Sequence, residues 1–431
     1  MEPIRIKIKQ LGRVRDSEIV LKPFMLLSGE SGLGKSYVAF LCHYIYMVLA
    51  DSKSTRINHF FEDNGYDYAE LSKNYKNEGI ALSFPKSELE DWLSKDAVRF
   101  VGYMVGNPDL KGDVRIMLPN TVEDTIKFTY KEEIAGLVGH DDVYILLSYN
   151  NISVRSLSDT QPDFAASPFA VLLMYGLLTA VFGFPLSIST SVIFPPSRGS
   201  LLTEDIHPEQ VKTGMYIEYL KAIDSFKKSK PMPEKVDKSL AALLNTILGG
   251  NLAQEDTGYY YITENGEKMP LSAAASSIRE LAPLRLLANR TNMSACELMY
   301  EEPEAHLHPE KQRLMGDVLA ALRRCGTRLI VTTHSDYLLK RLNEIILFLN
   351  VKENKKNWQQ LEEKLNIHSG MYFNVKDVAA YLLKGNEDGS SKVVLQNTKE
   401  GIPFTTFLNA NKANVEYHDY LMEAMGDELE Q

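Results

Sequence analysis

Eight consecutive residues near the N-terminus have the types and spacing of a phosphate-binding loop. They run from Gly29 to Ser36 and match the pattern G-x-x-x-x-G-K-[ST]. Glycines here let backbone N–H groups approach phosphate oxygens, and a helix that begins near Lys35 would direct the positive end of its dipole at them. Lys35 is expected to reach the β- and γ-phosphates, and Ser36 to ligate Mg²⁺. The sequence therefore predicts a site for ATP and Mg²⁺. The expected nucleotide contacts are Gly29, Ser31, Gly32, Leu33, Gly34, Lys35, Ser36 and Tyr37.

Two adjacent carboxylates end an apolar run much later in the chain. Residues 298–300 predict a buried strand, and Glu301 and Glu302 follow it. Because successive side chains on a strand point to opposite sides, the two acids can have different roles. Glu301 can support Mg²⁺, and Glu302 can orient or deprotonate an attacking water. A second predicted strand, 328–333, ends at His334, which can hydrogen-bond a γ-phosphate.

Each of these parts has a simpler explanation when it is taken alone. Adjacent glutamates most often lie on a solvated helix face, a lone histidine is most often structural, and a glycine-rich segment can be an ordinary turn. The order of phosphate loop, acidic strand end and histidine strand end is far more specific than any single part. We therefore interpret the three together as one catalytic site.

The segments Glu301–Pro309 (EEPEAHLHP) and Val331–Ser335 (VTTHS) resemble the ABC-type ATPases related to the OLD (overcoming lysogenization defect) proteins. The resemblance covers the phosphate loop and residues 245–350 well, and residues 51–244 less well. It implies that Glu301 is the Walker B acid at Mg²⁺, Glu302 the catalytic glutamate and His334 the switch histidine. His306 and His308 have the spacing of a zinc-binding pair, but the resemblance places them in a loop that touches a second subunit.

ABC ATPases complete each site with a signature motif from a second subunit, and this chain has two candidates for it. Ser276 and Ser277 follow a Leu-Gly-Gly and a predicted hairpin, as the resemblance leads one to expect, although Ile278 stands where glycine is usual. That departure implies slow or partner-dependent hydrolysis. Ser272, in an L-S-A-A sequence, is the rival, and a serine cap of an ordinary helix is the simpler alternative for either.

Two further residues are candidates for supporting roles. Arg198 ends a Pro-Pro-Ser-Arg sequence after an expected core strand, and either anchors a phosphate or braces a helical lobe. Gln161 is a weak candidate for the glutamine that senses Mg²⁺.

Composition places the chain among globular proteins of more than one lobe. Its 431 residues are 44% hydrophobic and 24% charged, with a net charge of −10 that does not indicate nucleic-acid binding. Three cysteines without C-x-x-C spacing fit a reducing cytoplasm. Residues 164–197 lack charge, but the densest apolar part, 169–184, is shorter than the roughly 20 residues that span a membrane. We expect a core helix there and no membrane partner.

The predicted fold is α/β: an ABC-type P-loop ATPase head with an inserted β and helical lobe and a small C-terminal extension. Residues 1–50 and 265–350 are expected to form the discontinuous ATP-binding core. Residues 51–264 are the insertion, with core elements near 165–198, and residues 351–431 are the α/β extension. Asn265-Gly266 between strand-like flanks predicts a hairpin.

The expected partners follow from the resemblance and from what the sequence lacks. The residues after 350 contain no cluster of acids that would indicate a nuclease. We therefore expect the chain to control a separate effector, a nuclease. The resemblance implies that it does so in anti-phage defence, as a homodimer or higher homo-oligomer. The alternative is a DNA-repair or DNA-structure ATPase that acts on DNA directly. The absence of heptads and the net charge disfavour it. A transporter head is a weaker third interpretation.

Overall fold

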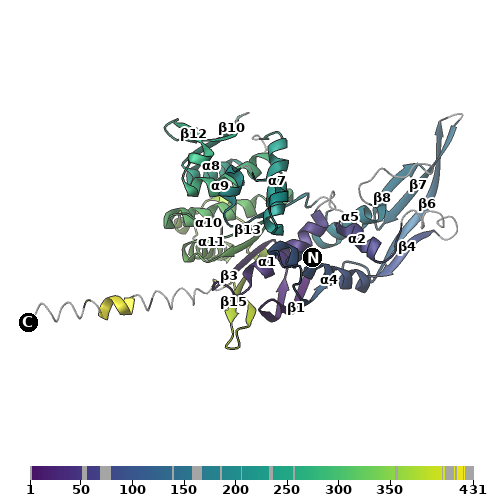
Figure 1. The fold of residues 1–431 in the computed structure, drawn as a ribbon, viewed down its shortest axis with the longest axis horizontal. Helices are drawn as coiled ribbons and strands as arrows, with labels where there is room; N and C mark the ends of the chain where they lie inside the picture. The colour runs from purple at the N-terminus through teal and green to yellow at the C-terminus, as the bar shows by residue number, and fades with distance from the viewer. Residues whose placement is uncertain are drawn as a thin grey trace, which may run out of the picture.

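The computed structural model has one large mixed sheet that carries the predicted site and two smaller sheets away from it (Figure 1). The structure describes residues 2–50, 56–67, 79–137, 140–157, 167–184, 187–204, 206–232, 236–255, 258–354, 358–399, 401–402, 412, 415–420 and 422.

The large sheet has nine strands, in the order β5-β1-β2-β16-β15-β3-β14-β13-β9. Its central strands, from β15 to β9, run parallel, so their carboxyl ends meet at one edge. Every residue of β3 and of β13 is buried, as expected for strands covered on both faces. The strands are β1 (Arg5–Leu11), β2 (Val14–Val20), β3 (Phe24–Gly29), β5 (Gly112–Met117), β9 (Thr190–Phe194), β13 (Cys296–Glu301), β14 (Arg328–Thr333), β15 (Val378–Gly385) and β16 (Ser391–Leu395).

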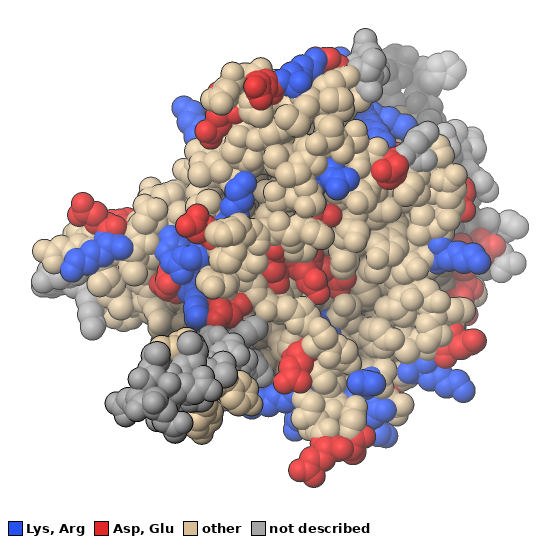
Figure 2. Space-filling view, turned by 60° about the vertical axis from the view of Figure 1, so that its left-hand side comes forward, with Lys and Arg blue, Asp and Glu red and all other residues tan. Residues whose placement is uncertain are grey.

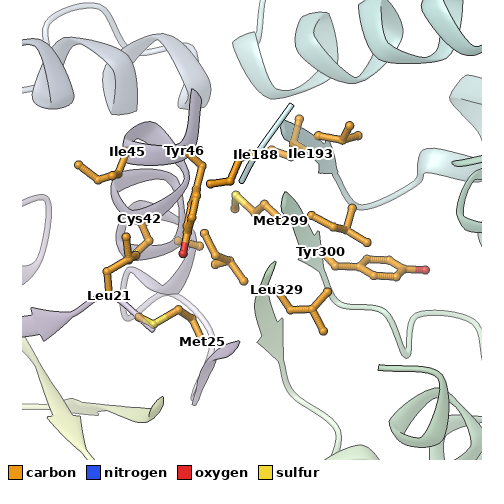
Figure 3. Close-up of a cluster of buried hydrophobic side chains, with 14 of the residues drawn as sticks. Leu21, Met25, Cys42, Ile45, Tyr46, Ile188, Ile193, Met299, Tyr300 and Leu329 are labelled. Atoms are coloured by element: carbon orange, nitrogen blue, oxygen red, sulfur yellow. The ribbon is translucent and has the colours of Figure 1, made fainter. Parts of the chain in front are cut away.

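Helix α1 packs against the parallel part of this sheet, contacting β3, β9, β13 and β14. Its apolar residues join the core beneath the strands, where Cys42, Ile45 and Tyr46 meet side chains from the sheet (Figure 3). Met299 points into this cluster and its neighbour Tyr300 points away from it, as alternation along β13 requires (Figure 3). The longer helices are α1 (Lys35–Ala50), α4 (Lys86–Val105), α5 (Pro168–Phe182), α7 (Gly214–Lys228), α8 (Lys238–Leu248), α9 (Ser276–Arg290), α10 (Pro309–Arg324) and α11 (Asp336–Asn354).

The uncharged segment that could pass for a membrane span is the buried core helix α5. It begins at a proline, ends at Gly183 with left-handed backbone, and contacts α1. Among the described residues, no helix combines the length and the apolar character that a membrane crossing requires.

The inserted region, together with β12, η4 and α9 from the expected core, forms two lobes that lie apart from each other (Figure 1). One is a four-stranded antiparallel sheet, and the other gathers α7, α8 and α9 with a three-stranded sheet. The hairpin predicted at Asn265-Gly266 is confirmed as β11–β12. The first lobe contains α2 (Arg56–Asp63), β4 (Ile80–Pro85), β6 (Thr125–Leu137), β7 (His140–Tyr149) and β8 (Ile152–Leu157). The second adds α6 (Arg198–Thr203), β10 (Gly250–Glu255), β11 (Gly258–Thr263), β12 (Lys268–Pro270) and the 3₁₀ turn η4 (Leu271–Ala273).

The predicted boundary at residue 351 needs correction, because it cuts through the large sheet. Strand β15 pairs in parallel with β3, and β16 pairs with β15 and β2. The first six residues of β15 are all buried, so this hairpin belongs to the core and not to an extension. Strand β5, from the region expected to be inserted, likewise pairs with β1 at the edge of the large sheet.

Candidate nucleotide site

The phosphate loop connects the end of β3 to the start of α1, as the motif predicts. Gly29, Gly32 and Gly34 have φ values of 130°, 77° and 93°, which side chains rarely adopt. At Gly29 a Cβ would also lie 2.5 Å from the carbonyl oxygen of Leu383 on β15. The loop conformation therefore needs glycine at these positions.

The C-terminal hairpin supports the phosphate loop from the side. Ser391 Oγ donates a hydrogen bond to the carbonyl oxygen of Leu33 at 2.7 Å, and Ser28 Oγ donates to the carbonyl oxygen of Tyr381 at 3.3 Å. The loop is thus held by β15 and β16 as well as by its own two ends.

Lys35 lies over the loop with its ammonium group held by loop carbonyls. Lys35 Nζ donates to the oxygens of Gly29 at 3.0 Å and Glu30 at 2.7 Å. Burial lowers the pKa of Lys35 to about 8, against the opposing charges of Glu302 and Glu301, which raise it. The side chain is therefore a cation near neutral pH, at the place where phosphate oxygens need one.

A cavity of about 460 Å³ opens above the loop and collects most of the predicted residues. It also includes Gly12 and Arg13, from the β1–β2 turn, which sequence reasoning missed. A Cβ at Gly12 would lie 2.4 Å from the ring of Tyr37, so the glycine makes room for that ring. The residues that line the cavity are Gly12, Arg13, Ser31, Gly32, Gly34, Lys35, Ser36, Tyr37, Glu302, Thr332 and His334.

Glu301 is the last residue of β13, and its buried carboxyl group interacts with the side chain of Ser36. Burial raises the pKa of Glu301 to about 7, and the charge of Glu302 adds to the effect, while Lys35 and Arg198 oppose it. Glu301 Oε1 is buried and has no hydrogen-bond partner. A hydroxyl beside a carboxylate with a free oxygen is a donor set that fits Mg²⁺.

Glu302 and His334 meet across the ends of β13 and β14. His334 Nε2 lies 3.5 Å from Glu302 Oε1, and both side chains face the cavity. Glu302 has a φ of 43°, and its N–H donates to the carbonyl oxygen of Thr332 at 3.1 Å, which fixes this strained turn to β14. Burial and the charge of Lys35 lower the pKa of His334, so its imidazole is neutral at pH 7.

Glu304 has a role that the sequence did not show. Its Oε1 accepts hydrogen bonds from Thr333 Oγ1 at 2.7 Å, His334 N at 2.8 Å and Ser335 N at 3.1 Å. This buried side chain ties the turn after β13 to the turn after β14, and so sets where His334 stands. The E-E-P-E sequence contained the residue but gave no sign of its partners.

The two signature candidates lie outside this cavity. Ser276 is the first residue of α9 and is exposed, Ser277 is partly exposed, and neither is among the residues that line the site. Ser272 lies in η4 beside a different cavity of about 390 Å³. The chain therefore does not bring its own signature candidates to its own phosphate loop.

The remaining candidates from the sequence are Arg198, His306, His308 and Gln161. Arg198 is fully buried and hydrogen-bonds backbone carbonyls, so it braces the structure and does not line the cavity. His306 and His308 are exposed, and within the described ranges no three His, Cys, Asp or Glu side chains form a group that could hold a metal ion. Gln161 lies outside the described residues.

A mixed sheet with a phosphate loop after one of its parallel strands and two acids at the end of another has the fold of a P-loop ATPase head. The predicted fold class is thereby confirmed. The family model described as an AAA ATPase domain matches residues 203–339, which contain both acids, His334 and the signature candidates.

Solved structures with a similar chain path include heads of SMC proteins. An SMC head bound to the C-terminal winged-helix domain of ScpA has 13% identity and a TM-score of 0.41, over 93% of this chain and 98% of that one. The SMC head domain from Thermotoga maritima has 10% identity and a TM-score of 0.33, over 92% and 100%. No protein of curated function matches the chain.

Proposed function

We propose that this protein hydrolyses ATP at sites completed by a second copy of itself. The observation that supports this most directly is the division of the site. Lys35, Glu302 and His334 surround one cavity, while Ser276 and Ser277 stand at an exposed helix N-terminus elsewhere on the same chain. A helix N-terminus is a ready site for phosphate oxygens, so a second copy can supply what the first lacks.

Each residue then has a defined task. The loop N–H groups and Lys35 bind the β- and γ-phosphates, and Ser36 with Glu301 would hold Mg²⁺. When bound, Mg²⁺ neutralises the charge that develops on the phosphates. Glu302 orients and deprotonates the attacking water, since its carboxylate faces the cavity. Neutral His334 keeps one N–H to donate to the γ-phosphate, and Glu304 fixes its backbone.

Replacing the base tests this assignment directly. Glu302→Gln keeps the shape of the side chain and should retain ATP binding, while kcat falls by about 100-fold or more. Bound ATP should then hold two copies together, which light scattering after size exclusion measures. Lys35→Ala is the matched control. Because this variant should not bind nucleotide, its oligomeric state should be the same with and without ATP. A Glu302→Gln chain that turns over at the wild-type rate would remove the general base from the proposal.

For the output of hydrolysis, we propose control of a separate effector, a nuclease, in anti-phage defence. The resemblance to OLD-related ATPases supports this. The clustered acids of the site, Glu301, Glu302 and Glu304, are engaged with the nucleotide machinery or the histidine turn. Purification from the native host in each nucleotide state, with and without infection, should recover the partner. DNA cleavage by the purified chain would contradict the assignment if it is lost when an acidic residue of this chain is replaced.

Direct action on DNA is the alternative, and the exposed face of β1 is where it would be sought. That face carries Arg5, Lys7 and Lys9, but Arg5 lies 3.2 Å from Glu18, and Lys9 lies 3.6 Å from Asp113. On the face drawn in Figure 2, acidic side chains gather near the middle and the visible lysines and arginines are scattered. On this face the lysines and arginines do not form the basic patch that a phosphate backbone needs.

A further inference from the structure

Arg198 occupies an unusual place for a charged residue, completely buried at the start of α6. It follows β9 after Ser197, whose φ of 62° turns the chain sharply. Its guanidinium group rests on the ring of Tyr300 at 4.5 Å. Burying this charge is costly unless every donor is engaged, so its partners show what it does.

The guanidinium group joins two parts of the protein that serve different sites. Toward the catalytic turn, Nη1 donates to the carbonyl oxygen of Glu301 at 3.0 Å, and Nη2 donates to that of Glu302 at 3.3 Å. Toward α9, whose N-terminus carries the signature candidates, Nε donates to the carbonyl oxygen of Glu280 at 3.1 Å. A fourth bond, from Nη1 to the carbonyl oxygen of Pro195 at 3.1 Å, connects the guanidinium group to the turn that precedes Arg198.

The contact between α6 and α9 is also close and hydrogen-bonded. Glu280 Oε1 accepts a hydrogen bond from the N–H of Gly199 at 3.2 Å, and its Oε2 lies 3.5 Å from Arg198 Nε. A Cβ at Gly199 would lie 2.6 Å from the backbone carbon of Arg279, so the two helices touch backbone to backbone. A displacement of α9 must therefore move Arg198 with it.

We propose that Arg198 is a positioning residue that couples the two composite sites of the dimer. This inference rests on the proposed function, in which the N-terminus of α9 binds the γ-phosphate held by the other copy. Glu280 lies four residues after Ser276, which is about 6 Å along a helix. Nucleotide held by the second copy pulls α9 of the first copy toward it. Through Arg198, this movement shifts the carbonyl groups of Glu301 and Glu302 in the first copy. The geometry of each composite site therefore depends on the nucleotide in the other.

The test is Arg198→Lys in the full-length chain, with ATP hydrolysis measured against ATP concentration. Lysine keeps the charge, but its three donors at one point cannot reach four separate carbonyls. The wild type should show a Hill coefficient above 1 and at most about 2, the limit for two sites. The variant should show a coefficient of 1 and a kcat lower by about 10- to 100-fold, the effect of a small misplacement of reacting groups.

Arg285→Lys is the matched control, because Arg285 lies on α9 and bonds only Asn289 among the hydrogen bonds described. It should keep the wild-type kcat and Hill coefficient. A folded Arg198→Lys dimer with wild-type values overturns the proposal, as does a wild-type Hill coefficient of 1. If Arg198→Lys does not fold, Glu280→Gln is judged by the same criteria. Failure of the proposed function would be visible earlier, as a wild type that neither hydrolyses ATP nor dimerises with it.

Discussion

Glu301→Gln should make the metal-free protein more stable above neutral pH, although it removes a proposed ligand of Mg²⁺. Burial raises the pKa of Glu301 from 4.5 to about 7, so the folded state resists ionisation of this group more than the unfolded state does. A raised acid pKa costs nothing below the unfolded value, and its cost grows as pH rises from about 4.5 to 7. At 1.36 kcal/mol for each pKa unit, the full cost is about 3 kcal/mol.

The assay is equilibrium unfolding in urea with EDTA, from pH 5 to pH 8.5. Wild type and Glu301→Gln should be close at pH 5, and the variant should be more stable by up to about 3 kcal/mol at pH 8. Glu310→Gln, which removes an exposed acid in the first turn of α10, is the control and should follow the wild type. Parallel pH profiles for wild type and Glu301→Gln would refute the reasoning.

Addition of Mg²⁺ and ATP should reverse the order of stability. A ligand that binds only the folded state stabilises it in proportion to the logarithm of its concentration over Kd. Wild type should gain stability with Mg²⁺ beyond that from ATP alone, and Glu301→Gln should gain little. This second measurement separates the loss of a metal ligand from a general change in packing.

Three other substitutions test the site. Lys35→Ala should abolish ATP binding and leave the circular dichroism spectrum unchanged; retained ATPase activity would contradict the phosphate-loop assignment. Mixing Lys35→Ala with Ser277→Arg chains should restore one intact site per heterodimer and part of the activity, and no recovery in a confirmed heterodimer would count against shared sites. Glu304→Ala should destabilise the protein by about 2–5 kcal/mol, because it strands buried donors, and should lower kcat; an unchanged kcat would show that His334 is placed by other contacts.

The parts of the site that the sequence predicted are those encoded locally. The glycines and Lys35 act within one loop, and an apolar run that ends in Glu301 and Glu302 requires only that a buried strand reach the sheet edge. The phosphate loop, Glu302 and His334 meet at one cavity because the parallel strands that precede them end at the same edge of the sheet.

The parts that were missed depend on contacts between distant segments. Gly12 and Arg13 form the turn between β1 and β2, and they reach the cavity only because this hairpin lies beside the phosphate loop, a placement that its own sequence does not specify. Glu304 stands in the same E-E-P-E sequence as the two site acids, yet its partners are three groups about 30 residues later in the chain. The position of β15 beside β3 was likewise hidden, since an apolar strand can pair with many others.

The support that β15 and β16 give to the phosphate loop has a consequence for the order in which the protein matures. On the ribosome, β3 and the loop are made first, and their neighbour Ser391 is made about 360 residues later. Until β15 is made, one side of β3 is unpaired, and until Ser391 is made its bond to Leu33 cannot form. Pairings so distant in sequence close slowly. We expect a nascent chain stopped before residue 378 to lack nucleotide binding, so ATP would be bound only by a head whose sheet has closed.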